Sequence, residues 1–547
     1  LTTNVYAQAV PNIGDALKQA EMPKLQTAPT PALPNIGGIQ IEPPMTALPT
    51  GPKIMVKAFE VMGNREIAKE VLQSLVAGDS GKELTLSELE DVAKKITLHY
   101  RTTGYFVARA YIPAQEVEGN VIKIRVVEGN YGQFHLKNTS LVRDDIVQAM
   151  LDDVKDYDIV SLDTLERAML IINDTPGSQI VRADVMPGQK VGTSDFAVGT
   201  VATPAQNGFV MLDNYGSAYT GKHRMSFNYD NNSPAGLGDR LSISGMATEA
   251  GGLLNGRIGY STLLMPNGLR GELAVSHTQY SLGGAYSNLD AKGTAKGLDA
   301  TLTYPIRRIR AQTIEASVNL AKKDLEDRID STNTVTPKDS KSATFGINLK
   351  DERELFGFDG LTTASISATL GDHSINDATA LANDAKGAQT NGSYSKANLS
   401  LARVSLLPEN FSLTATLKYQ RSLDGKNLDS SERMAVSGSS GVYAYPSGEL
   451  MGSNAVLAKL ELSHPLLAVD GLTHSASIFT TKGYAESAKA ISATDKGRDI
   501  SDVGLGWKAN YQNVMLNAHV AYRVEDTVPT SEKVDRVRLL LQAGYLF

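Results

Sequence analysis

The chain has no cysteine and a single tryptophan among its 547 residues, and its eight histidines are scattered. Without cysteine it can form no disulfide bond, no thiolate zinc site and no thiol nucleophile. No segment approaches the roughly 18 uninterrupted apolar residues of a membrane-spanning helix, which excludes a helical membrane protein. The formal charge of −7 argues against nucleic acid as a partner.

Signatures of common active sites are also missing. No His-Glu-x-x-His motif is present, and the Ser-Gly-rich residues 437–441 lack the Gly-x-Ser-x-Gly spacing of a hydrolase elbow. We therefore predict that the chain is not an enzyme and that it needs no metal and no cofactor.

The final eleven residues carry an apolar side chain at every second position. The apolar set is Val537, Leu539, Leu541, Ala543, Tyr545 and Phe547. Lipid must be met by every second residue of a barrel strand, and an aromatic end can anchor the closing strand at the interface. We expect Tyr545 and Phe547 to form such a C-terminal barrel signal, although the last strand of a soluble sandwich can alternate in the same way.

The same two-residue period recurs back along the chain. It is clear in residues 514–524, 503–511 and 411–419 and weaker in residues 314–320 and 456–462. From about residue 207 onward we count roughly sixteen such segments, separated by Gly, Asn, Asp and Ser turns. The sequence thus predicts a transmembrane β-barrel of about 16 antiparallel strands over residues 204–547.

The first part of the chain has three expected pieces. Residues 1–9 read as a signal-peptide remnant, or as an ordinary flexible terminus. Residues 10–22 predict a short amphipathic helix with Ile13, Ala16, Leu17 and Ala20 on its apolar face, too short to be stable unless it docks. Residues 23–52 are rich in proline and predict an extended linker that could thread the height of a barrel.

Two small α+β modules are expected next, over residues 53–130 and 131–203. Each predicts the order strand, helix, helix, strand, strand. In the first module the elements are residues 54–60, 65–75, 86–100, 106–112 and 121–127. In the second they are residues 131–136, 142–151, 162–172, 179–185 and 194–201.

Tandem modules ahead of a barrel resemble the outer-membrane transporters of two-partner secretion, whose modules are called POTRA domains. The resemblance covers nearly the whole chain from about residue 50, and its motifs, each weak alone, are in the right order. They lie at residues 105–113 (Tyr-Phe-Val-Ala-Arg-Ala-Tyr-Ile-Pro), 126–129 (Val-Val-Glu-Gly), 170–177, 192–195, 213–216, 219–221 and 232–239.

The resemblance implies a function and a location. Such transporters export haemagglutinin-like adhesins, haemolysins or contact-dependent inhibition toxins. The expected partners are a secreted protein with an N-terminal secretion domain, outer-membrane lipid and the barrel assembly machinery, with the POTRA domains in the periplasm. An assembly factor that inserts other barrels is the runner-up, and a passive porin is disfavoured because porins need no capture modules.

Client capture is expected at an open sheet edge of the first module. An exposed strand at residues 106–112, with Phe106, Ala108, Ala110 and Ile112, could offer backbone hydrogen bonds to an extended client. The family also implies that residues 10–22 plug the pore, whereas a disordered tail is the alternative reading.

One departure from the family pattern concerns a loop that folds into the barrel. Members present an arginine in Val-Arg-Gly-Tyr or Val-Arg-Ala-Tyr that pairs with an aspartate of Phe-x-Asp-x-Gly on the wall. Here the matching residues are Val442, Tyr443, Ala444 and Tyr445 in the loop, and Phe479, Thr481 and Gly483 on the wall. Since losing one buried partner would strand the other charge, we interpret the joint loss as compensated and expect neutral packing there.

Overall fold

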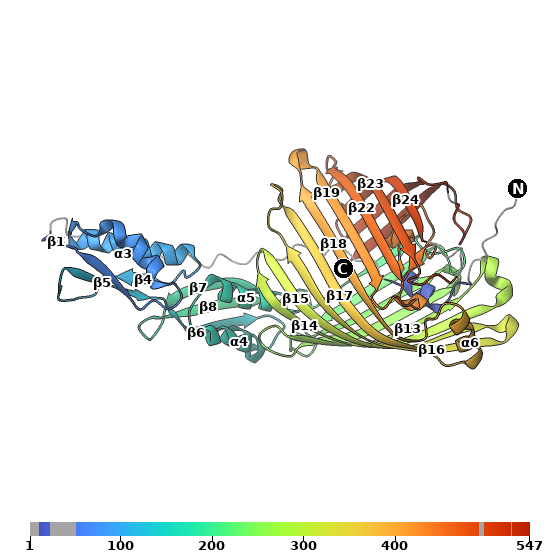
Figure 1. Ribbon diagram of the computed structural model, residues 1–547, viewed down its shortest axis with the longest axis horizontal. Coiled ribbons are helices and arrows are strands. Elements are labelled where there is room, and N and C mark those ends of the chain that lie inside the picture. The colour runs from blue at the N-terminus through green and yellow to red at the C-terminus, as the bar shows by residue number, and fades with distance from the viewer. Residues whose placement is uncertain (1–9, 22–50, 492–496, 527) are drawn as a thin grey trace.

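The computed structural model describes residues 10–21, 51–491, 497–526 and 528–547. Two small modules lie in line and lead to one end of a wide β-barrel (Figure 1). The expected signal remnant at residues 1–9, and all but residues 51 and 52 of the expected linker, lie outside the described residues.

The first module has a three-stranded sheet in the order β2-β5-β4. Its elements are β1 (Ile54–Met55), β2 (Ala58–Met62), α2 (Lys69–Val76), a 3₁₀ turn (Ala77–Asp79), β3 (Glu83–Leu84), α3 (Leu86–Thr102), β4 (Arg109–Tyr111) and β5 (Val121–Val127). The strand expected at residues 54–60 is split, because Val56 N–H bonds to Lys82 O and Lys57 N–H to Asn120 O, so the chain changes pairing partner there. The next helix begins at Lys69, because the buried Glu128 carboxylate holds the N–H groups of Arg65 and Glu66.

The second module repeats the order, with a sheet β6-β8-β7. Its elements are β6 (Asn130–Thr139), α4 (Asp144–Asp152), a 3₁₀ turn (Asp153–Tyr157), α5 (Leu162–Asn173), β7 (Gln179–Pro187) and β8 (Thr193–Val201). Phe134 and Phe196 stack at its centre with ring centroids 5.1 Å apart. Phe106 and Val107 of the first module pack against this core, which joins the two modules.

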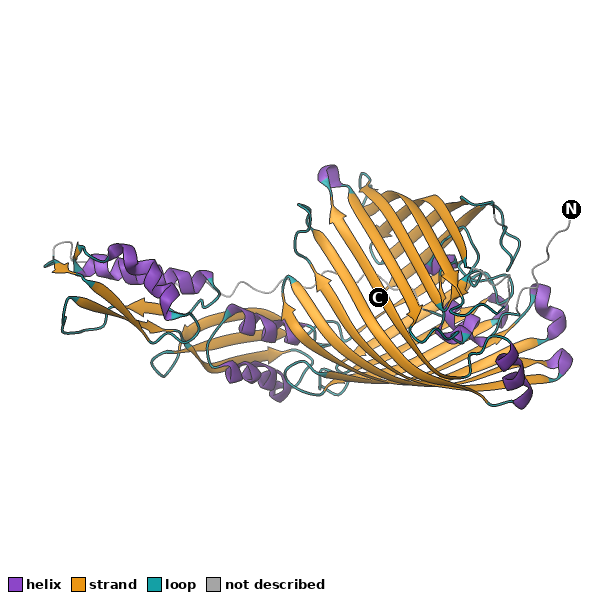
Figure 2. Cartoon of the chain, in the orientation of Figure 1, coloured by secondary structure: helices purple, strands orange, loops and turns teal. Residues whose placement is uncertain are grey.

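The barrel is closed and has sixteen antiparallel strands, as the sequence predicts. Figure 2 shows the tilted strands wrapping around the lumen. They are β9 (Gln206–Asp213), β10 (Arg224–Asn232), β11 (Arg240–Thr248), β12 (Leu253–Leu263), β13 (Arg270–Ser281), β14 (Ala291–Ile309), β15 (Gln312–Ile329), β16 (Thr334–Asp351), β17 (Gly360–Ile375), β18 (Gly392–Leu406), β19 (Ser412–Ser422), β22 (Asn454–Pro465), β23 (Leu472–Glu486), β24 (Arg498–Tyr511), β25 (Val514–Arg523) and β26 (Val537–Leu546).

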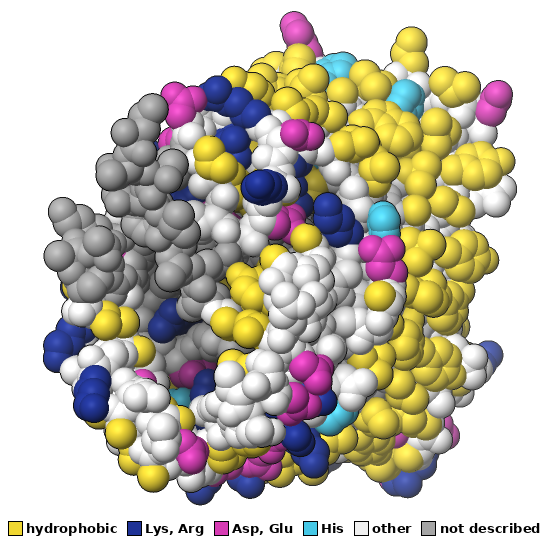
Figure 3. Space-filling view, turned by 90° about the vertical axis from the view of Figure 1, so that its right-hand side faces the viewer, with side chains coloured by type: hydrophobic (Ala, Val, Ile, Leu, Met, Phe, Trp, Pro, Cys, Tyr) yellow, Lys and Arg dark blue, Asp and Glu magenta, His cyan; other side chains and the backbone are white. Residues whose placement is uncertain are grey.

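Side chains alternate between the lumen and the outer surface. On β26 the exposed residues include Val537, Leu539, Leu541 and Tyr545, and Leu540 is buried between them. Seen from the end away from the modules, hydrophobic side chains gather along the outer flank (Figure 3). The last strand closes the barrel against β9, with Tyr545 paired to Val210. No helix within the described residues is both long and apolar enough to cross a membrane.

The second module is fastened to the barrel base. The Arg308 guanidinium on β14 makes two hydrogen bonds to the Asp174 carboxylate, Nε to Oδ2 at 2.6 Å and Nη2 to Oδ1 at 2.8 Å. Arg167 on α5 donates to the Asn267 carbonyl at 3.2 Å. Bidentate arginine–carboxylate contacts fix orientation as well as distance. The second module is therefore held in a fixed orientation at one end of the barrel.

Candidate functional site

A short helix, α1 (Ile13–Gln19), lies inside the barrel. Asn12 caps its start, because the Asn12 side chain accepts from Gly14 N–H at 2.9 Å and Asp15 Oδ2 accepts from Asn12 N–H at 2.8 Å. This reciprocal capping box satisfies donors that a helix start leaves unpaired. With only seven residues, α1 still depends on its surroundings for stability.

The apolar face of α1 packs onto the inner wall. Ile13, Ala16 and Ala20 are buried, and Leu17 packs partly buried beside them. Their neighbours lie in β11–β15, in the β13–β14 connection and in the β9–β10 connection: Tyr219, Met246, Leu253, Tyr280, Leu282, Ala291, Ala295 and Leu325. The structure thus brings together the four residues expected on this face. Their role as a pore plug stays a prediction.

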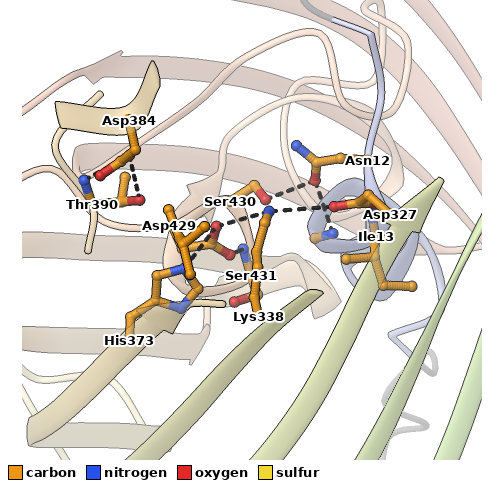
Figure 4. A network of polar contacts seen from close by, with 12 residues as sticks. Asn12, Ile13, Asp327, Lys338, His373, Asp384, Thr390, Asp429, Ser430 and Ser431 are labelled. Atoms are coloured by element: carbon orange, nitrogen blue, oxygen red, sulfur yellow. Dashed lines mark hydrogen bonds and ion pairs between the residues drawn. The ribbon is translucent and has the colours of Figure 1, made fainter. Parts of the chain in front are cut away.

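Polar contacts hold the start of α1 between the wall and a loop (Figure 4). Asp327 Oδ1 on β15 accepts from Ile13 N–H at 2.7 Å, and the Ser430 hydroxyl donates to Asn12 Oδ1 at 2.7 Å. A Cβ at Gly14 would overlap Ser430 Oγ and the backbone nitrogen of Ser431. The helix can therefore approach the loop this closely only with glycine at this position.

Lys338 links these two supports of α1. Its ammonium on β16 lies 3.3 Å from Asp327 Oδ2 and 3.4 Å from Asp429 Oδ2, so one lysine joins the wall to the loop (Figure 4). His373 Nε2 on β17 lies 3.5 Å from the same Asp429 oxygen. Burial opposes ionisation of Asp429, but Lys338 and His373 outweigh it and hold its pKa well below its usual range.

The other end of α1 is held by the β9–β10 connection and by the first residue of β10. Arg224 Nη1 donates to the Gln19 carbonyl at 2.7 Å, and the Thr220 hydroxyl donates to Gln19 Oε1 at 2.7 Å. A guanidinium at the C-terminal end of a helix complements the helix dipole. Within the helix, burial raises the pKa of the Asp15 carboxyl to about 6, although Asn12 N–H and Arg433 favour its charged form.

The loop that contacts α1 spans residues 423–453 between β19 and β22 and folds back into the barrel. It carries two 3₁₀ turns (Ser430–Glu432 and Gly438–Ser440) and a small hairpin of β20 (Met434–Ala435) and β21 (Met451–Gly452). Glu432 is clamped by Lys323 and Lys396, each at 2.8 Å. Burial opposes ionisation of Glu432, but the two lysines outweigh it and lower its pKa to about 2.

The tip of this loop reaches the opposite wall. Val442, Ala444 and Tyr445 are fully buried, and Ala444 N–H donates to Asp502 Oδ2 on β24 at 3.0 Å. Arg538 on β26 donates to the Tyr443 carbonyl at 2.9 Å and also to the Tyr445 carbonyl. Wall charges therefore bind the backbone of the loop.

The expectation of purely neutral packing at this contact is wrong. Tyr443 packs edge-on against Phe479, with ring centroids 5.4 Å apart, and its hydroxyl accepts from Lys459 Nζ at 3.3 Å. Thr481 is buried, and its hydroxyl has no hydrogen-bond partner within the described part of the chain. It lies between two charged neighbours in the sheet, paired with Lys459 on β22 and with Asp502 on β24.

Asp502 is the residue that the sequence reasoning missed. The segment Ile500-Ser-Asp-Val-Gly504 repeats the x-Asp-x-Gly spacing of the wall motif one strand later, so the signal was present. Gly483 keeps its place at the contact, since a Cβ there would lie 3.0 Å from Val436 Cβ of the loop. Lys482 faces outward, where it pairs with Asp499 at 3.2 Å.

An Asp502→Ala variant is expected to lose about 1–3 kcal/mol of unfolding free energy, because Ala444 N–H would be left buried without an acceptor. Asp502→Asn should lose less, since an amide oxygen can still accept that hydrogen bond. The measurement is the temperature to which a sample must be heated before loading for the faster-running, folded band to disappear from the gel. Asp499→Ala, on the outer face of the same strand, is the matched control, and equal losses for Asp499→Ala and Asp502→Ala would contradict the assignment.

Residues 106–112 do not form the single exposed strand that the sequence predicts, because β4 comprises only Arg109–Tyr111. Ala108 and Ala110 are 0% and 6% exposed and point into the module core, Phe106 packs on the second module, and Ile112 packs on the first core. Ala110 N–H already donates to the Thr97 hydroxyl of α3 at 2.9 Å. Alternation thus turns Ala108 and Ala110 inward, and client capture at this edge stays a prediction.

The sequence matches a known protein family. Residues 192–509 match the family described as haemolysin secretion/activation protein ShlB/FhaC/HecB, which is more than half of the chain. The chain belongs to this family. Residues 54–129 also match the POTRA domain, ShlB-type.

Named relatives agree with the family. The heme/hemopexin transporter protein HuxB of Haemophilus influenzae is 25% identical over 541 residues, covering 97% of this chain and 95% of HuxB. The outer membrane transporter CdiB of Escherichia coli is 26% identical over 203 residues, covering 37% of this chain and 34% of CdiB.

Solved structures show the same fold. CdiB from Escherichia coli aligns with a TM-score of 0.75 at 18% identity, covering 98% of this chain and 95% of CdiB. BamA from Haemophilus ducreyi lacking POTRA domains 1-3 aligns with a TM-score of 0.52 at 13% identity, covering 90% of this chain and 100% of that chain. The assembly-factor alternative is thus the weaker match.

The family settles the function and the location predicted from the sequence. The chain is a two-partner secretion transporter of the outer membrane that moves a secreted partner protein, with POTRA domains in the periplasm. Relatives in the family are transporters and not enzymes.

Proposed function

We propose that the POTRA pair captures the unfolded partner through its N-terminal secretion domain and delivers it to a lumen that α1 and the loop 423–453 keep closed at rest. The observation that carries this proposal is the close contact between α1 and the loop, where Gly14 packs directly against Ser430 and the Ser430 hydroxyl donates to Asn12. A helix of seven residues held by wall and loop contacts can leave at a modest energetic cost, whereas a folded domain in the lumen could not.

The site of capture is proposed on the exposed face of the first module. Alternation leaves Tyr111 exposed on β4 while Ala110 is buried, so an extended client lying along this edge would meet Tyr111. β7 (Gln179–Pro187) is the corresponding edge strand of the second module. Edge strands accept added strands through backbone hydrogen bonds, which suits a client of variable sequence. Because Thr97 already bonds to the Ala110 peptide group of β4, we propose this backbone pairing for β7 and contact with the Tyr111 side chain for β4.

Further partners follow from the outer surface of the barrel. The outward apolar residues that end in Tyr545 and Phe547 support contact with outer-membrane lipid and recognition by the barrel assembly machinery. We also propose that the chain has no catalytic activity. We propose the domain limits predicted from the sequence, with the plug helix at residues 10–22, the linker at 23–52, the POTRA domains at 53–130 and 131–203, and the barrel at 204–547.

The capture site can be tested with a photocrosslinking amino acid. Benzoylphenylalanine at Tyr111 replaces one exposed aromatic with another, and irradiation in cells that express the secreted partner should yield a crosslinked adduct. The same substitution at Val71, exposed on α2, is the matched control and should yield none. Adducts at Val71 and none at Tyr111 would place capture on another face of the module.

A further inference from the structure

A groove crosses the outer surface of β14, β15, β16 and β17, away from the lumen. Its apolar floor and walls are formed by Leu298, Ala300, Leu320, Ala343 and Leu370. Leu298, Leu320 and Leu370 are 52%, 56% and 57% exposed, so they stand out as ridges with the two alanines between them. The spacing of ridges and floor suits a linear hydrocarbon chain.

The groove lies at the upper limit of the apolar belt. Outward side chains along β15 change from apolar to charged in the order Ile314, Ala316, Val318, Leu320, Lys322, Asp324, Glu326 and Arg328. Lys322 is ten steps above Gln312 at the periplasmic end of the strand. With a rise of about 3.3 Å per residue and the usual tilt, that distance is roughly the 25 Å height of an apolar belt.

Lysines gather at the mouth of the groove. Lys322 and Lys341 both border it and are direct partners in the β15–β16 ladder. Like charges directly opposite one another in a sheet are destabilising unless something neutralises them. Lys322 has Asp324 at 3.1 Å, whereas no ion pair of Lys341 occurs among the described residues.

Three carboxylates lie near the two lysines at the mouth of the groove. Asp324 and Asp339 pair with each other one row farther from the apolar belt, beside Lys296. Asp372 pairs with Lys341 in the ladder, and its oxygens accept from the hydroxyls of Ser393 and Ser374 at 3.1 and 3.4 Å. The row next to the groove therefore places two lysines side by side, with Asp372 beside Lys341, and of these two lysines only Lys322 has an ion pair within the described residues.

We propose that this groove binds one lipopolysaccharide molecule, with an acyl chain on the apolar floor and a lipid A phosphate between Lys322 and Lys341. The groove faces the outer leaflet, where the headgroup phosphates lie at the end of the hydrocarbon layer. β14, β15 and β16 have 19, 18 and 18 residues and continue beyond the lysine row, where they would lie beside the saccharide. This inference is independent of the proposed capture and plugging.

The test uses the full chain purified in detergent and stripped of lipid. Binding of bisphosphorylated lipid A, dephosphorylated lipid A and phosphatidylglycerol is measured by native mass spectrometry. For lipid A we expect the Lys322→Gln/Lys341→Gln variant to bind about tenfold more weakly, since each lysine contributes to holding an anionic headgroup. Lys222→Gln/Lys292→Gln changes the net charge equally at sites outside the groove and should bind as the unchanged protein does.

Each other outcome overturns the assignment. Equal lipid A binding by both variants would show that the lysine pair is not the site, and equal binding of dephosphorylated lipid A would show that the phosphate is not recognised. Phosphatidylglycerol bound as tightly as lipid A would assign the groove to phospholipid. An unheated gel confirms in each case that the variant barrel is folded.

Discussion

A Gly14→Ala variant is expected to conduct ions as if residues 10–21 had been deleted. The added Cβ overlaps Ser430 Oγ and the Ser431 backbone nitrogen, and a backbone atom cannot swing aside as a side chain can. Alanine favours the helix itself by about 1 kcal/mol over glycine, so the variant weakens docking and not helix formation. In planar bilayers the single-channel conductance should rise to that of the deletion.

The matched control is Gly256→Ala on β12, where a Cβ would have no neighbour within 4 Å. Its conductance should equal that of the unchanged protein. If Gly14→Ala also conducted like the unchanged protein while the deletion did not, the contact of Gly14 with the loop would not be what keeps the pore closed.

Excising residues 53–127 is expected to abolish secretion of the partner while leaving a closed barrel. The deletion removes every helix and strand of the first POTRA domain but keeps the contacts of the second with the barrel base, among them the Arg308–Asp174 pair. The partner should accumulate in the periplasm and disappear from the medium, as immunoblots of both fractions would show.

A folded barrel in that variant is verified by the shift between heated and unheated gel bands. Tyr111→Phe, which keeps an aromatic ring on the exposed face of β4, is the conservative comparison and should secrete normally. Secretion close to normal after the excision would move client recognition to the second POTRA domain or to the lumen.

The sequence was most informative where periodicity decides structure. The alternation that ends at Phe547 correctly predicted the barrel, because each outward residue must meet lipid. It was less informative about partners across the lumen. Asp502 binds the loop from β24, one strand beyond the position of the family aspartate, and the ladder that pairs it with Thr481 shows that the two positions are neighbours.

Short edge segments were also hard to predict. Residues 106–112 read as one exposed strand, but β4 has only three residues and Thr97 of α3 covers the Ala110 peptide group. Such a contact depends on how a helix packs on a sheet, which local sequence does not specify. Gly14 is similar, because its need for glycine comes from a loop more than 400 positions away.

The central claim is that the partner crosses the lumen that α1 occupies, and a reversible lock on α1 tests it most directly. The chain has no cysteine, so Asn12→Cys with Ser430→Cys, whose present side chains meet at 2.7 Å, would introduce the only possible disulfide. With the bond formed, secretion should stop, and a reducing agent should restore it, whereas each single variant should secrete under both conditions. Undiminished secretion with the disulfide intact would contradict passage through this lumen.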